Sequence, residues 1–313
     1  MRPFACLIAA GMLAVTTFAA NAAPVAYGEA FDTLYRIDLT THTATAVGAA
    51  GRYAGQTIGN ISGLTTAPDG TLYAAAGGQK LLIAVNPASG AARVVGSLGL
   101  AGQGDPDHND ALDLNMVASC DGTLWLSSAV AGKLWTVNPA TGATSLVGAT
   151  GHTITGLVAR GAALYGAGGQ GDNNFYRIDT RTGAATLIGS FGSQLTGWVD
   201  TVSMSFDSNG TLWAVLNYVP PQNDNDPIAT WSDLATINPD TGTVSIVGPI
   251  TGPASLRQVG IKGFTAGVAP CAGSEPMAAP VASAWSLGLL GGLLALVGLI
   301  AGRRRSRLRT NAP

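Results

Sequence analysis

A motif of one tight turn followed by one strand recurs five times and constrains how this chain can fold. Each copy has Asn or Asp before the turn and a strand-like run after it that ends in Gly. Asn and Asp accept hydrogen bonds from the turn backbone, and the Gly inside the turn adopts the positive φ that such turns require. His42 takes that place in the first copy. The copies are IDLTTHTATAVG, VNPASGAARVVG, VNPATGATSLVG, IDTRTGAATLIG and INPDTGTVSIVG, which end at Gly48, Gly96, Gly148, Gly189 and Gly248.

The spacing of the copies predicts a β-propeller. The closing glycines are 48, 52, 41 and 59 residues apart, and repeats of about 40–50 residues with several strands each are typical of propeller blades. We therefore predict an all-β, five-bladed propeller over residues 24–267. The first blade has three strands of its own, so the strand at residues 259–265 fills its inner place. Aligning Gly260-Ile261 with Gly63-Leu64 brings the two ends of the chain together and removes the open sheet edges.

Aromatic residues recur at fixed positions of the predicted strands. Such a stripe could stack a sugar or a base, but at fixed blade positions it more often forms the packing between blades. We predict the packing role. The residues are Tyr73, Trp125, Tyr165 and Trp213 in second strands and Tyr35, Trp135 and Tyr176 in third strands.

The first residues are typical of an exported protein. Arg2 precedes an apolar run, and small residues follow up to position 23, which predicts a secretory signal peptide over residues 1–23. Cys120 and Cys271 remain in the mature chain. An oxidising compartment would allow them to form a disulfide, and two buried thiols are the alternative.

The C-terminal part predicts a membrane-crossing helix behind a linker. Residues 268–279 are rich in Pro, Ala and Gly, and an apolar run precedes an arginine cluster at residues 303–309. The stretch from Trp285 to Ala301 has 17 residues, about 26 Å as a helix, which is just enough to cross a bilayer. Trp at one interface and arginines at the other predict that the arginines stay cytoplasmic and the body lies outside.

The segment at residues 280–309 resembles the C-terminal sorting signals of the PEP-CTERM/IPTL-CTERM class. The resemblance rests on Pro280, Ser283 and Trp285, followed by the helix and the arginines, and covers only about the last 35 residues. It implies export by the secretion machinery, transit through the inner membrane and processing by an exosortase-like enzyme. Delivery to the cell surface or the extracellular space would follow. A plain single-pass anchor is the alternative.

The charge distribution excludes nucleic acid as the expected partner. All 18 acidic residues lie between Glu29 and Glu275. Six of the 16 basic residues lie in the signal peptide and the tail, which leaves the body with 10 basic residues and a net charge of −8. An acidic body repels a phosphate backbone.

Residues 100–111 form a long acidic loop between the second and third blades. Its carboxylates and amide resemble the start of a calcium loop, because hard cations favour clustered oxygen ligands. The pattern then fails, because Asp110 stands where Gly is needed and Met116 where Glu is needed. Ca²⁺ is thus the only cofactor that the sequence suggests, against a solvated loop as the alternative. Its candidate ligands are Asp105, Asp107, Asn109 and Asp110.

The starts of the inner strands surround one mouth of a propeller channel, which predicts a second candidate site there. No nucleophile elbow, zinc-protease motif or phosphate loop occurs in the sequence, and no catalytic residue is assigned. The alternative is that these polar side chains cap strands and bind water. The candidate ligand-binding residues are Asn60, Asp113, Asn115, His152, Asp200 and Arg257.

The body resembles secreted bacterial propellers with PDG-TLY and NP-TG turns. That group includes binding modules as well as lactonase-like and lyase-like enzymes, so the motifs specify turns rather than an activity. We interpret the chain as an exported propeller that binds a polysaccharide or a surface protein at the cell surface or in the matrix. The alternatives are a metal-dependent hydrolase or lyase that uses the mouth residues, and a purely structural surface protein.

Overall fold

The computed structural model describes residues 25–195, 197–218, 232–253, 256, 260–268 and 271. The chain divides into two units, Met1–Pro270 and Cys271–Pro313. All strands belong to the first unit, and Cys271 is the only described residue of the second. The predicted signal peptide, most of the linker and the predicted sorting signal therefore lie outside the described residues.

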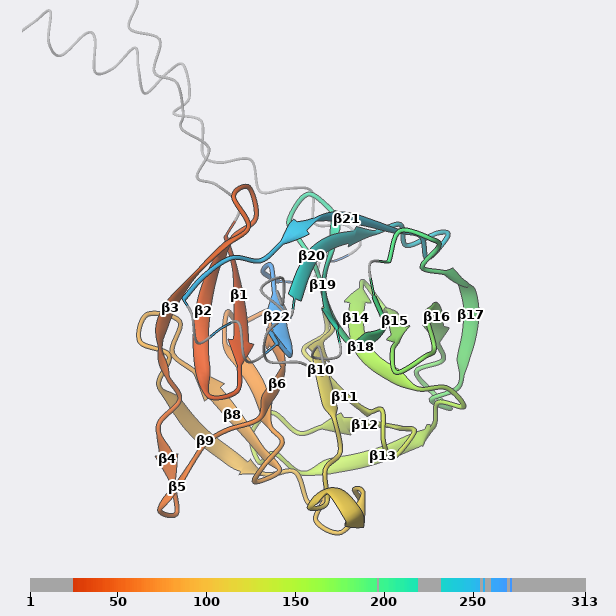
Figure 1. The fold of residues 1–313 in the computed structure, drawn as a ribbon. Coiled ribbons are helices and arrows are strands. Elements are labelled where there is room, and N and C mark those ends of the chain that lie inside the picture. Colours follow the sequence, from red (N-terminus) through yellow and green to blue (C-terminus); the bar gives the residue numbers. More distant parts are fainter. Residues whose placement is uncertain are drawn as a thin grey trace, which may run out of the picture. The chain divides into compact units, whose positions relative to one another are not determined.

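Five four-stranded antiparallel sheets make up the first unit and confirm the all-β, five-bladed prediction. Their inner strands gather around the middle of Figure 1, and their outer strands lie on the rim. From inside to outside, the first blade is β22 (Gly263–Thr265), β1 (Val25–Ala30), β2 (Thr33–Asp38) and β3 (Thr43–Ala49), and the second is β6 (Ile61–Thr66), β7 (Leu72–Ala76), β8 (Leu81–Val85) and β9 (Ala92–Ser97). The third blade is β10 (Leu114–Ala118), β11 (Leu124–Ser128), β12 (Lys133–Val137) and β13 (Thr144–Ala149), and the fourth is β14 (Ile154–Arg160), β15 (Ala163–Gly168), β16 (Asn174–Ile178) and β17 (Ala185–Ser190). The fifth blade is β18 (Val199–Phe206), β19 (Leu212–Tyr218), β20 (Ser232–Ile237) and β21 (Val244–Pro249).

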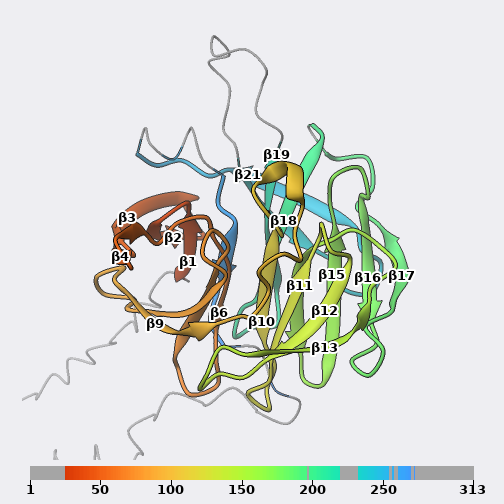
Figure 2. The same ribbon diagram turned by 90° about the horizontal axis from the view of Figure 1, so that it is seen from below.

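Two smaller elements lie between the blades. A hairpin of β4 (Arg52–Tyr53) and β5 (Gln56–Thr57) links the first and second blades and was not expected from the sequence. The 3-10 helix η1 (Pro106–His108) lies in the acidic loop. Figure 2 shows η1 (gold) at the end of the third blade where β10 begins.

The ring closes in two places. The C-terminal β22 pairs with β1, with Thr265 opposite Tyr27, which confirms closure by a strand from the far end. At the rim, Thr43 forms a parallel bridge with Thr251, and the Thr251 N–H donates to the His42 carbonyl at 2.9 Å. Both contacts join the first blade to residues that follow the fifth.

The predicted alignment of the closing strand is wrong by three residues. Tyr73 in the second blade pairs with Thr65, and the equivalent Tyr27 pairs with Thr265. Gly263 is therefore the counterpart of Gly63, and Gly260 is not. Both glycines precede an apolar residue, so the local pattern cannot distinguish them. The pairing with β1 decides the register.

The aromatic stripes pack between blades, as predicted. Tyr35, Trp135 and Tyr176 are 4%, 2% and 1% exposed. The second-strand aromatics lie nearer the channel and are less buried, and the indole N–H of Trp125 donates to Ser119 Oγ at 3.1 Å. Burial of aromatic faces with a satisfied polar tip is the usual arrangement for such residues.

Polar side chains of the inner strands join each blade to the next. In four of the five junctions a side-chain oxygen accepts a backbone N–H of the neighbouring blade, and in the fifth a backbone carbonyl does so. Buried backbone groups are thereby satisfied without breaking the sheets. The bonds are Ala118 N to Thr65 Oγ1, 2.9 Å; Leu157 N to Asn115 Oδ1, 2.9 Å; Val202 N to Thr155 Oγ1, 3.1 Å; Ala266 N to Ser205 Oγ, 2.9 Å; and Gly63 N to the Lys262 carbonyl, 3.3 Å.

The repeated glycines form the corresponding junctions at the rim. The glycine that ends one motif lies against the turn of the next blade, so a Cβ on Gly148 would stand 1.9 Å from the Thr182 carbonyl oxygen. Gly96 and Thr141 repeat the same contact at 1.9 Å. Glycine is required here because the two backbones approach too closely for a side chain. Each motif therefore contributes to two junctions: its turn contacts the preceding blade, and its closing glycine contacts the following blade.

Within the described residues, the structure has no helix with the length and apolarity needed to cross a membrane. Residues 285–301, where the sequence predicts such a helix, are outside them. The predicted span stays a prediction.

Replacing Gly148 with Ala should destabilise the junction between the third and fourth blades. The added Cβ would collide with the Thr182 carbonyl, and such overpacking costs about 1–3 kcal/mol. Thermal unfolding should show a melting temperature lower by several degrees. Gly78→Ala is the matched control, because a Cβ there would lie 3.3 Å from its nearest neighbour and neither glycine has a positive φ. Equal melting of the two variants would contradict the argument.

Candidate functional site

A small cavity opens among the starts of the inner strands. It measures about 20 Å³, which is room for about one water molecule. Counted along the sequence, four blades line it with the residue three positions before the one that pairs with the second-strand aromatic: Ser62, Leu114, Thr155 and Lys262. The cavity is lined by Asn60, Ser62, Asp113, Leu114, Thr155, Thr201 and Lys262, so every blade contributes.

Irregular pairing turns side chains toward this mouth. In β14 the register shifts between Ile154 and Gly156, which leaves Thr155 in a bulge. In β18 it shifts between Val199 and Thr201, which leaves Asp200 in a bulge. A bulged residue is released from the ladder, and its side chain points in a new direction.

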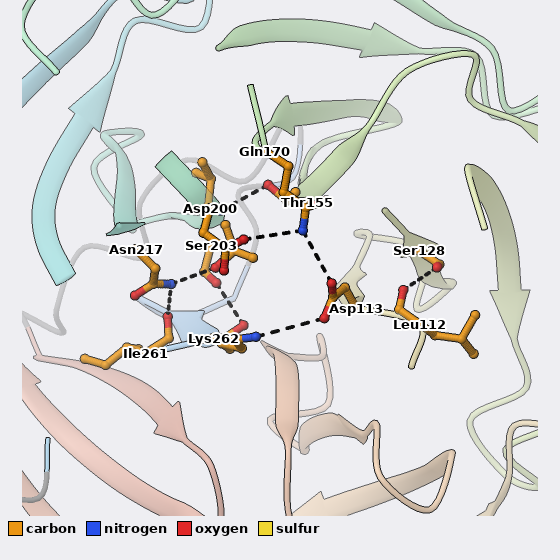
Figure 3. Close-up of polar contacts among 12 residues, drawn as sticks. Leu112, Asp113, Ser128, Thr155, Gln170, Asp200, Ser203, Asn217, Ile261 and Lys262 are labelled. Carbon is orange, nitrogen blue, oxygen red and sulfur yellow. Dashed lines mark hydrogen bonds and ion pairs between the residues drawn. The ribbon is translucent and has the colours of Figure 1, made fainter. Parts of the chain in front are cut away.

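Two carboxylates from different blades meet at the mouth. Gln170 Nε2, in the turn between β15 and β16, lies 3.4 Å from Asp113 Oδ2 and 3.4 Å from Asp200 Oδ1. Lys262 Nζ lies 4.0 Å from Asp113 Oδ1 (Figure 3). The Lys262 and Asp113 side chains are 33% and 29% exposed, so water screens this ion pair and it adds little stability. The amide and the ammonium therefore orient carboxylates that stay open to a ligand.

Three mouth residues have an uncommon backbone conformation. Asn60, Asp113 and Gln170 have φ values of 51°, 44° and 56°. Non-glycine residues rarely adopt this region, although Asn and Asp tolerate it best. Backbone bonds hold all three, from Gly77 N to the Asn60 carbonyl at 3.0 Å, from Ala129 N to the Asp113 carbonyl at 3.3 Å and from Gln170 N to the Val199 carbonyl at 2.9 Å. Such strain persists only where the surroundings impose it, and it concentrates at functional sites.

Of the six predicted mouth residues, three lie at the mouth, two lie elsewhere and one is outside the described residues. Asn60 and Asp113 line the cavity, and Asp200 joins them through Gln170. Asn115 is 4% exposed and supports the neighbouring blade through Leu157. Arg257 lies outside the described residues. Its predicted place depended on the alignment that the β22 register corrects.

His152 lies in a different cluster. Its Nδ1 is 3.6 Å from Asp172 Oδ2, and its ring is 4.4 Å from the Tyr176 ring. The Tyr176 hydroxyl donates to Asp172 Oδ1 at 2.7 Å, and burial and that carboxylate raise the pKa of Tyr176 to about 12. The cluster positions the imidazole beside the fourth blade, not at the cavity.

Several residues at the mouth were not predicted from the sequence. Lys262 was misplaced because the closing strand was aligned three residues too early. Thr155 and Thr201 lie in strands that were expected, but no sequence pattern indicates the bulges at Thr155 and at Asp200, next to Thr201. Gln170 follows two glycines in a turn, where a polar residue ordinarily indicates only solvent exposure.

Asp110 organises the acidic loop. Its carboxylate accepts the Gly102 N–H at 2.8 Å and the Gly104 N–H at 2.6 Å, and it pairs with Lys80 Nζ at 2.6 Å. The hydrogen bond from Lys80 and the two backbone bonds lower the pKa of Asp110 to about 2. This carboxylate therefore holds the loop to the second blade.

The other candidate calcium ligands act within the loop. Asp105 Oδ1 caps η1 by accepting the Asp107 N–H at 2.9 Å, and Asp105 Oδ2 lies 2.7 Å from His108 Nδ1. Asn109 caps the other end of η1 with a φ of 55°. In the part of the chain that the structure describes, no three or more His, Cys, Asp or Glu side chains are grouped to hold a metal ion. The calcium interpretation gains no geometric support.

Cys120 and Cys271 are both disulfide-bonded. Cys120 belongs to the first unit and Cys271 to the second. Their pairing with each other stays a prediction.

Glu29 is a buried acid on β1, beside the closing strand. It is fully buried, and neither carboxylate oxygen has a hydrogen-bond partner among the described residues. It pairs through its backbone with Gly263, and its carbonyl accepts the Lys262 N–H at 2.9 Å. Burial, with a smaller effect of the Asp32 charge, raises the pKa of Glu29 to about 8. The side chain is therefore mostly protonated at neutral pH.

Solved structures resemble this chain at low identity. A protein of unknown function from Bacteroides thetaiotaomicron is 14% identical to this chain, with a TM-score of 0.45. The match covers 61% of this chain and 53% of the Bacteroides protein. This chain thus spans about half the length of that protein. A candidate gluconolactonase is 17% identical, with coverage of 74% and 80% and a TM-score of 0.42. A chain of a nidogen/laminin complex is 12% identical, with coverage of 77% and 97% and a TM-score of 0.48.

No protein-family model matches this chain, and no curated protein matches its sequence. The TM-scores given above are all below 0.5. The fold assignment therefore rests on the five blades of the structure itself.

The stability of the protein should fall as the pH rises between about 4.5 and about 8, in part through Glu29. In that window the unfolded chain loses the Glu29 proton and the folded chain keeps it, so folding is favoured most at low pH. Glu29→Gln removes this contribution, which is on the order of 1.4 kcal/mol per pH unit. Urea unfolding at pH 4 and pH 9 should show near-equal stability at pH 4 and a more stable variant at pH 9. Asp240→Asn, at an exposed turn, is the control. Parallel curves for wild type and Glu29→Gln would refute the assignment.

Proposed function

We propose that this protein is an exported propeller that binds a ligand at the cell surface or in the extracellular matrix through its channel mouth. One observation carries the proposal: Asp113 and Asp200, from different blades, converge on Gln170 beside an open cavity. Convergent polar groups at a concave site are the usual mark of a ligand site.

The hydroxyl groups of Thr155 and Thr201 already have hydrogen-bond partners, which favours binding over nucleophilic catalysis at the mouth. Thr155 Oγ1 donates to the Gly168 carbonyl at 3.0 Å and accepts the Val202 N–H. Thr201 Oγ1 accepts from Asn217 Nδ2 at 3.0 Å. An activated nucleophile needs a base within hydrogen-bond reach, and these hydroxyls are bonded to backbone groups or to an amide.

The scaffold also favours binding because it is preorganised. Asn217 Nδ2 donates to the Ile261 carbonyl at 2.7 Å, and Ser203 Oγ donates to the Lys262 carbonyl at 2.9 Å (Figure 3). These bonds fix the segment that presents the Lys262 side chain. A site that is already ordered loses less entropy when a ligand binds.

The tail supports the same function by giving the propeller a destination. Pro280, Ser283 and Trp285 precede the apolar run and the arginines. We propose that an exosortase-like enzyme reads these residues and releases the protein to the surface. The proposal rests on the sequence pattern alone.

Replacing both Asp113 and Asp200 with Asn should weaken binding of the purified protein to the envelope and matrix of the producing cells by at least about tenfold. The substitution keeps the shape of the mouth and removes two charges that would accept ligand hydrogen bonds. Co-sedimentation measures the binding. Asp69→Asn with Asp240→Asn makes the same change in charge at exposed turns and should bind normally. Undiminished binding by the mouth variant would place the function elsewhere.

Changing Ser283 and Trp285 to Ala should leave uncut protein in the inner membrane. A plain anchor needs only length, apolarity and flanking charge, whereas a sorting enzyme must recognise these side chains. The mass of the mature surface protein is the measurement. If its C-terminus still contains residues 301–309, no cleavage took place and the plain anchor is correct. Arg303→Ala, Arg304→Ala and Arg305→Ala together should disturb orientation in either case.

A further inference from the structure

Trp198 is a large exposed aromatic next to the mouth. It is 51% exposed and immediately precedes β18, the strand that carries Asp200. A Trp side chain has a large apolar surface, so leaving half of it in water forgoes substantial burial. Ligand sites combine aromatic side chains with a few placed polar groups, so its neighbours at the mouth, and not its exposure alone, make Trp198 a candidate ligand contact.

The turn that carries Gln170 links this indole to the two carboxylates. The Gln170 N–H donates to the Val199 carbonyl at 2.9 Å, which joins the turn to the start of β18. A Cβ on Gly171 would lie 3.7 Å from Trp198 Nε1, so the indole adjoins the turn. The same turn sends its amide to Asp113 and Asp200. Trp198 and the polar mouth therefore form one continuous surface.

The chemistry of this surface suits a neutral polyhydroxylated ring. Asp113 and Asp200 accept hydrogen bonds, Lys262 donates them, and the amides of Asn60 and Gln170 do both. Sugar hydroxyls both donate and accept, and the C–H face of a pyranose packs on an aromatic ring. An organic cation would also suit Trp198 and the carboxylates. The Lys262 ammonium, 4.0 Å from Asp113, would repel it.

Size decides how such a ring would sit. The cavity, at about 20 Å³, admits a single hydroxyl-sized group and no ring. We infer that the mouth binds a pyranose unit of a polysaccharide, whose ring face stacks on Trp198 while one of its hydroxyl groups enters the cavity toward Asp113 and Asp200. This inference rests on the proposed function and names its ligand class.

The test measures binding of the full-length mature protein to methyl pyranosides of glucose, galactose and N-acetylglucosamine by saturation-transfer NMR titration. At least one pyranoside should bind. Trp198→Ala should weaken that binding by about tenfold or more, and Trp198→Phe should retain part of it. Tyr53→Ala, which removes an aromatic that is 46% exposed on β4, should bind like the wild type. Unchanged thermal unfolding of each variant verifies that its fold is intact.

Three outcomes overturn the inference. They are binding of no pyranoside by the wild type, equal binding by Trp198→Ala, and binding of tetramethylammonium in place of every sugar. Binding of the same variants to the cell envelope shows whether only the sugar inference fails or the proposed function fails as well. If Asp113→Asn with Asp200→Asn loses envelope binding and Trp198→Ala retains it, the mouth is a binding site for another ligand. If neither variant loses it, both proposals are wrong.

Discussion

Hydrogen bonds from the backbone of one blade to the inner strand of its neighbour hold the ring of this propeller together. A propeller blade is a twisted sheet with apolar faces, and its innermost strand would otherwise leave an edge of unpaired backbone groups around the channel. Side chains such as Thr65, Asn115 and Thr155 accept these N–H groups. At the rim the contact is steric, because glycine lets one blade's strand lie against the next blade's turn. The blades are thus joined by polar bonds inside and by close backbone packing outside.

The same inner ring produces the candidate site. Strands that begin at one end of a closed ring bring their first residues together, so polar residues that are remote in sequence meet at the mouth. Bulges at Thr155 and Asp200, and left-handed conformations at Asn60, Asp113 and Gln170, direct these groups toward the mouth. The bulged Thr155 also serves the scaffold, because its Oγ1 accepts the Val202 N–H of the next blade. Local departures of this kind, within a scaffold that otherwise satisfies its backbone, are expected at functional sites.

The closing strand was predicted correctly from the sequence, but its register was not. The incomplete first blade and the extra strand after the fifth implied closure, and β22 pairs with β1 as expected. The register was wrong because Gly260-Ile261 and Gly263-Phe264 are equivalent as local patterns. That shift placed Arg257 at the mouth and hid Lys262. Register depends on which residues face a partner strand, and the partner is more than 200 residues away in sequence.

The blades, their turns and their closure could all be predicted from the residues alone. Turn chemistry and alternating apolar residues are local properties, and their repetition at blade-length intervals admits few architectures. Which polar side chains reach the mouth depends instead on how the folded blades meet. Asn115 was expected to bind a ligand and holds Leu157, while Gln170, from an unremarkable turn, lies between two carboxylates. The reason is physical: a hydrogen bond between blades depends on register, bulges and ring geometry, and none of these is written in the residues that surround either partner.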